Sequence, residues 1–131
     1  MRELLPERRR SYSVEVIHAW AVGTPQEIHE PLLVTIGLFD DDRIGEVFID
    51  STAEKLGRLS QRTLDLQKDT AVMISIALQH GVPIEELRGA TARSETNVMG
   101  RIRVMPATIA GTVLNVLADE QAKLREAAGT I

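Results

Sequence analysis

Acidic residues are the first candidates for chemistry in this chain. Three consecutive aspartates, Asp40, Asp41 and Asp42, could offer carboxylate oxygens to a hard cation such as Ca²⁺. A calcium loop of the EF-hand type needs oxygens at alternate positions, a central glycine and a distant glutamate, and Arg43 and Ile44 interrupt that spacing. We therefore interpret the run as the solvated tip of a hairpin and predict no metal site there.

The histidines and serines follow no pattern that is typical of catalysis. His18, His29 and His80 are scattered, and none lies four residues from another as in a helical zinc motif. His18 falls on a predicted strand, where packing or solvation is a simpler role than catalysis. No nucleophile elbow, P-loop or dinucleotide-binding glycine motif occurs in the sequence. We assign no catalytic residue, no metal ligand and no cofactor, and we expect a protein that is not an enzyme.

Arginines offer a second kind of site. One cluster occupies residues 8–10, and Arg93, Arg101 and Arg103 form another. Because a guanidinium group binds phosphate through paired N–H donors, this second group is a candidate phosphate-binding or nucleotide-binding face. The chain as a whole is acidic, with 19 acidic and 15 basic residues, and it lacks helix-turn-helix and RNA-recognition motifs. Nucleotide or nucleic-acid binding is therefore the alternative hypothesis and not the first.

Composition limits the classes of protein further. The 131 residues include no cysteine, which excludes disulfides, thiolate zinc sites, iron–sulfur clusters and thiol chemistry, and favours a reducing, cytoplasmic setting. The longest nearly uncharged stretch, residues 70–79, is far shorter than the ~20 residues that span a bilayer. The first ten residues have no signal-peptide pattern. We expect a cytoplasmic protein with no membrane segment.

The first half of the chain predicts strands. Residues 1–10 are highly charged and without a sustained period, so we interpret them as a flexible charged arm before a single domain at residues 11–128. Apolar and polar residues alternate over residues 11–20, and branched residues dominate residues 31–39. Alternation returns over residues 45–50, after the acidic tip, which predicts a hairpin.

A helical period begins after this hairpin. Apolar residues recur at three- and four-residue steps over residues 53–79, and the second half, residues 71–78, is apolar around most of its circumference. This pattern predicts a central helix that is buried in the core or covered on its second side by another subunit. Its candidate core or oligomer residues are Leu66, Met73, Ile74 and Ala77.

The last third of the chain predicts a turn, a strand and a second long helix. Gly81 suits a left-handed helix end, and Pro83 can begin a short helix. Residues 91–104 predict a loop that leads into a short strand, and Pro106 is expected to start the C-terminal helix. The predicted fold is α+β, with a small antiparallel sheet of three to four strands packed on the central helix and the C-terminal helix.

Two segments carry a resemblance to a known family. Residues 45–50 (GEVFID) and 75–87 (SIALQHGVPIEEL) resemble the C-terminal domain of adenosylcobalamin-dependent, class II ribonucleotide reductases, which is called the TSCPD domain. Weaker similarity extends over residues 31–120. The resemblance implies a shared fold. The family's Thr-Ser-Cys-Pro-Asp motif and its C-terminal cysteines are missing, so reductase chemistry and cobalamin binding are not carried over.

These observations favour a non-catalytic relative of that reductase domain. We expect it to act by binding, as a homo-oligomer, with a dimer as the first expectation, as an accessory to a separate protein, or as both. The physical reason is the apolar central helix, which needs two covering surfaces when a small sheet provides only one.

Overall fold

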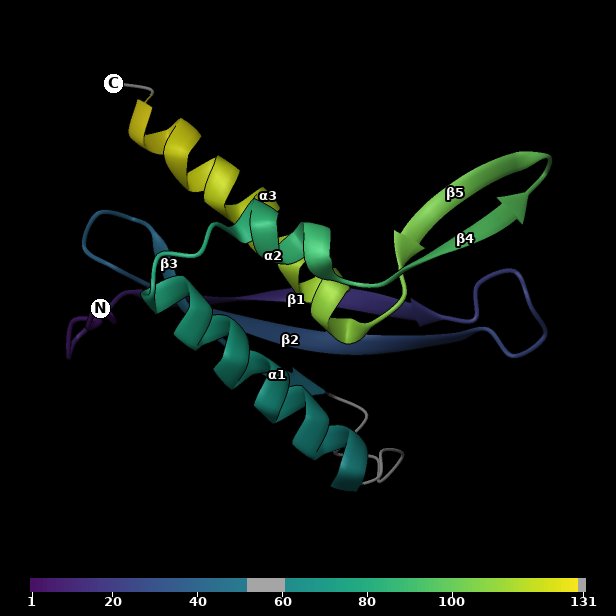
Figure 1. Cartoon of the computed structure of the whole chain (residues 1–131), viewed down its shortest axis with the longest axis horizontal. Coiled ribbons are helices and arrows are strands. Elements are labelled where there is room, and N and C mark those ends of the chain that lie inside the picture. Colours follow the sequence, from purple (N-terminus) through teal and green to yellow (C-terminus); the bar gives the residue numbers. More distant parts are fainter. Residues whose placement is uncertain (52–60, 130–131) are drawn as a thin grey trace.

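Three antiparallel strands form the main sheet in the order β1–β2–β3 (Figure 1). The strands are β1 (Ser11–Trp20), β2 (Ile28–Leu38) and β3 (Ile44–Ser51). The computed structural model describes residues 1–51 and 61–129. Val34 of β2 pairs with Val14 of β1 and Ile49 of β3, so the three apolar side chains share one face. The hairpin at the acidic tip and the α+β class that the alternation predicted are therefore confirmed.

Only one face of this sheet is covered. In β2 the side chains of Leu32, Val34 and Ile36 are buried, whereas Leu33 and Thr35, which point to the opposite face, remain partly accessible. Helices α1 (Gln61–Gln79) and α3 (Ile109–Gly129) supply the other half of this core. In Figure 1, α1 crosses β3 and α3 crosses β1, so the two helices share the covered face.

Helix α1 is buried along one side and exposed along the other. Ile74 is 6% exposed and lies in the core, and Ala77 is partly buried, but Leu66 is 61% and Met73 is 69% exposed. The sequence left the second covering surface of this helix open between the C-terminal helix and another subunit; α3 lies over β1 beside α1 and does not cover its outer side. Residues 53–60, where the helix was expected to begin, lie outside the described residues.

The segment after α1 differs most from the sequence prediction. Gly81 has the expected positive φ of 84°, and α2 (Ile84–Ala90) follows Pro83. Residues that were expected to form a loop and one strand form a hairpin instead, with β4 (Arg93–Val98) and β5 (Arg101–Pro106) as a separate two-stranded sheet.

The tight turn of this second hairpin explains its formation. Met99 and Gly100 both have positive φ, at 53° and 80°, which is the conformation of a two-residue turn that matches the twist of paired strands. The ribbon of β4 and β5 extends beyond the helices in Figure 1. Pro106 ends β5, and α3 begins three residues later at Ile109, so the prediction that Pro106 starts the helix is wrong.

The first ten residues contact the β2–β3 end of the body. The Glu3 N–H donates to the Gln79 carbonyl at 2.7 Å, and the Glu3 carboxylate pairs with Arg43 at 2.7 Å. Arg9 pairs with Glu46. These contacts hold residues of the arm, which the sequence predicted to be flexible, against the body. No helix among the described residues is long and apolar enough to cross a bilayer.

The core predicts which truncations destabilise the fold. Leu117 of α3 is fully buried, so Leu117→Ala should lower the free energy of unfolding by about 2–5 kcal/mol, through lost transfer energy and a residual cavity. Leu4→Ala is the control, because Leu4 is 84% exposed, and its effect should be within about 0.5 kcal/mol. Urea unfolding of both variants measures the difference; equal effects would contradict this core.

Candidate functional site

Side chains of α1 cover the free edge of β3. Because β3 is an edge strand, alternate backbone groups face away from β2 and need other partners. The Val47 N–H donates to Ser75 Oγ at 2.9 Å, and Gln79 Nε2 donates to the Gly45 carbonyl at 2.9 Å. Ser75 and Gln79 are four residues apart on the helix and therefore reach two successive outward positions of the strand. Another strand cannot pair with β3 at these positions without displacing the helix.

A groove of about 700 Å³ runs alongside this contact. Phe48, which points to the uncovered face of the sheet, and Val72 and Ile76 of α1 contribute its apolar wall, and they are 51%, 55% and 37% exposed. Lys68 and Asp50 add charges of opposite sign. The groove therefore offers an apolar surface with charges of both signs around it.

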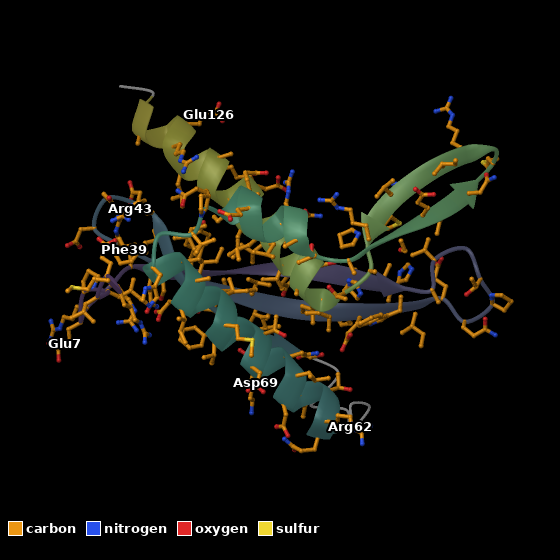
Figure 2. All side chains as sticks on the ribbon, in the orientation of Figure 1. Glu7, Phe39, Arg43, Arg62, Asp69 and Glu126 are labelled. Carbon is orange, nitrogen blue, oxygen red and sulfur yellow. The ribbon has the colours of Figure 1, made fainter. Side chains whose placement is uncertain are left out.

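The exposed apolar surface continues along α1. Leu66 and Met73 are seven residues apart, which places them on the same side of the helix, and both are mostly exposed. Asp69 lies between them and points away from the sheet (Figure 2). The exposed apolar side chains Leu66, Val72, Met73 and Ile76 are called the α1 surface below.

A second polar group lies inside the core, and sequence reasoning missed it. His18 is 1% exposed, and its Nδ1 is 2.6 Å from the hydroxyl of Thr112 in α3. Glu30 is also buried and accepts hydrogen bonds from Trp20 Nε1 at 2.9 Å and from Gln67 Nε2 of α1 at 3.3 Å. The alternation along β1 places His18 and Trp20 on the inward face, and this was a signal in the sequence. Their partners could not be predicted, because Glu30, Gln67 and Thr112 come from three other elements.

The buried group ties both helices to the sheet. The His18 and Trp20 rings meet edge to face at 4.2 Å. Burial lowers the pKa of His18, and the nearby charge of Glu30 opposes that effect only in part. Among the described residues, no protein atom hydrogen-bonds the buried Nε2 of His18. The arrangement therefore favours a neutral imidazole, which suits a structural role.

The arginines singled out in the sequence do not share one face. Arg101 and Arg103 are two residues apart in β5, and because side chains alternate along a strand, both arginines lie on one face of the ribbon. Arg103 pairs with Thr96, which shares this face. Arg93 is three positions from Thr96 and belongs to the opposite face. The structure thus divides the candidate patch into a pair of arginines and a single one.

Arginines engage the aspartates of the hairpin tip. Arg43 Nε binds Asp41 at 2.7 Å, which lowers the pKa of that carboxyl, and Arg10 pairs with Asp42. The Arg43 guanidinium also stacks over the Phe39 ring at 4.6 Å, as Figure 2 shows at this end of the molecule. Across residues 1–51 and 61–129, no three potential metal ligands come together.

Comparison with known proteins places the chain in a family. The family model described as the TSCPD domain matches residues 10–117, which include all five strands and the first half of α3. This chain belongs to the TSCPD domain family. The resemblance seen in residues 45–50 and 75–87 is thereby confirmed, and the structure shows that these two segments of the TSCPD domain meet where α1 covers β3.

Individual relatives of this TSCPD domain are much longer proteins. Two of them, from Bradyrhizobium diazoefficiens and Agrobacterium fabrum, are described as vitamin B12-dependent ribonucleotide reductases. They are 35% and 39% identical to this chain over 85 residues, which is 65% of the chain and 6% of each relative. No solved structure matches the chain.

The buried histidine predicts how stability depends on pH. Because the pKa of His18 is lower in the folded protein than in the unfolded chain, the unfolded chain takes up the proton first as pH falls. Stability from this group is complete above the unfolded pKa of about 6.5 and is lost as pH falls below it. Calorimetry should therefore give a lower melting temperature at pH 5.5 than at pH 7.5.

Two variants isolate this effect. His18→Gln removes the titrating group and should reduce the difference in melting temperature between the two pH values, although the variant is less stable overall. His80→Gln is the control, because His80 is exposed and its replacement should leave the difference unchanged. An undiminished pH dependence in His18→Gln would show that another group causes it.

Proposed function

We propose that this protein is a non-catalytic, cytoplasmic binding module related to the C-terminal domain of ribonucleotide reductases, and that it acts through self-association or as an accessory to another protein. The observation that carries the proposal is the α1 surface, where four large apolar side chains lie exposed on one helix. Membership of the TSCPD family supports the relation to the reductase domain. The absence of cysteine supports a role other than thiol-dependent reduction.

The free energy of burying apolar groups favours a partner that covers the α1 surface. Contiguous exposed apolar side chains on a soluble protein mark interaction sites, because each buried CH₂ group contributes about 0.8 kcal/mol. The α1 surface also suits pairing with a second copy. Two antiparallel copies of α1 would bring Leu66 of one copy to Met73 of the other, and the two Asp69 carboxylates between them would oppose this contact with a repulsion that the apolar contacts must exceed. The first occupant we propose is therefore the same helix of another copy.

Light scattering at micromolar concentration tests self-association. We expect a dimer for the unchanged protein and a monomer for Leu66→Glu and Met73→Glu, because each substitution would bury a charge in the interface. Both residues are exposed in the single chain, so circular dichroism should remain unchanged. Ile102→Glu is the matched control, since Ile102 is 69% exposed on the separate ribbon and should leave the dimer intact. A strict monomer for the unchanged protein would count against self-association and leave the accessory role to be sought with a partner.

A second function rests on the ribbon. Arg101 and Arg103 are exposed on one face of a two-stranded sheet, and a two-stranded ribbon fits the major groove of DNA. This arrangement supports nucleic-acid binding as the alternative function.

A titration with short duplex DNA at low salt tests this alternative. Arg101→Ala and Arg103→Ala should each weaken binding several-fold and make it less dependent on salt, because each removes a phosphate contact. Arg93→Ala, on the opposite face, should have a smaller effect. Absent binding, or binding that neither substitution weakens, would exclude this function.

A further inference from the structure

A polar pocket of about 460 Å³ lies where the ribbon joins the body. It is bounded by the end of α2, the start of β4, the end of β5 and one side of α3. Its volume falls within the range of about 300–1,000 Å³ that is typical of small-molecule sites. No residue of the α1 surface lines it, and neither Arg101 nor Arg103 does.

Helix α3 presents polar and small residues to this pocket. Gly111, Asn115 and Asp119 follow one another at four-residue steps and therefore share one side of the helix. A side chain at Gly111 would bring its Cβ to 3.0 Å from Pro106 Cβ and 3.3 Å from Thr91 Oγ1. The glycine thus allows the close approach of α3 to the foot of the ribbon.

Two arginines face these groups across the pocket. Among the residues that the structure describes, Arg93 makes only a 3.4 Å hydrogen bond to the Arg88 carbonyl, and Arg88 makes only a 3.4 Å ion pair with Glu85. Both guanidinium groups therefore keep N–H donors for a ligand. Arg93 lies here and not beside Arg101 and Arg103.

The opposite side of the pocket holds acceptors without protein partners. Within the described part of the chain, no protein group hydrogen-bonds the Asn115 amide or the Asp119 carboxylate, although Asn115 is partly buried. Two guanidinium groups and one carboxylate give the lining a positive balance. Such a lining suits a ligand that is anionic at one end and carries hydrogen-bond donors at the other.

We propose that this pocket binds a small phosphate ester that carries hydroxyl groups, such as a nucleoside monophosphate or a sugar phosphate. Arg88 and Arg93 bind the phosphate, and Asn115 and Asp119 accept hydrogen bonds from the hydroxyl groups. The proposal goes beyond the proposed binding function, because it needs neither self-association nor the outer arginine pair.

Isothermal titration with adenosine monophosphate, glucose 6-phosphate, glucose and inorganic phosphate tests the pocket. We expect one or both esters to bind, inorganic phosphate to bind more weakly, and glucose not to bind. The ester that binds with the higher affinity shows whether the ligand is a nucleotide or a sugar phosphate. Arg88→Ala and Arg93→Ala should each weaken ester binding about tenfold, as the loss of a charge-assisted hydrogen bond would do.

Further variants separate ligand contacts from effects on folding. Arg88→Lys keeps the charge but loses the planar fork, so it should weaken binding while the melting temperature is unchanged. Asp119→Asn should weaken ester binding several-fold but not phosphate binding. Arg101→Ala and Arg103→Ala are matched controls and should have no effect.

Three results would overturn the proposal. They are no binding of either ester at millimolar concentration, equal losses in the Arg93 and Arg101 variants, and esters that bind no better than inorganic phosphate. Failure of this proposal is distinguishable from failure of the proposed self-association. The pocket residues do not lie on the α1 surface, so light scattering on the pocket variants measures self-association independently of ligand binding.

Discussion

The contact of α1 with the free edge of β3 is the interaction on which the rest of the structure depends. Ser75 and Gln79 satisfy outward backbone groups of Val47 and Gly45, so the edge is protected from pairing with other strands at that point. The same contact orients α1, which directs Ile74 into the core and leaves Leu66 and Met73 outside. An exposed apolar surface is thus a consequence of how the helix protects the edge.

The buried polar group adds a second constraint on the same helix. Glu30 accepts hydrogen bonds from β1 and from α1, and His18 contacts α3, so a shift of either helix would leave a buried donor or acceptor without its partner. Such losses cost about 1–3 kcal/mol each, more than most exposed contacts contribute. We infer that this group fixes how the two helices lie on the sheet, whereas the apolar core provides most of the stability.

These constraints leave exposed surfaces of different chemistry in separate places. The α1 surface is apolar, the outer face of the ribbon carries Arg101 and Arg103, and the pocket at the foot of the ribbon combines Arg93 with the side chains of α3. The segment that matches the two reductases makes up 6% of each of them. The binding proposals above rest on these three surfaces.

The sequence alone determined the α+β class, the hairpin at the acidic tip, the left-handed Gly81 and the family, because each depends on local alternation, turn chemistry or a contiguous motif. It did not reveal the second hairpin, since residues 93–106 are too polar for their alternation to stand out. Only the tertiary structure showed that one side of α1 is exposed, that Arg93 is separated from Arg101, and that His18 meets Thr112. Those facts depend on how distant elements pack together, and the spacing of residues along the chain does not contain that information.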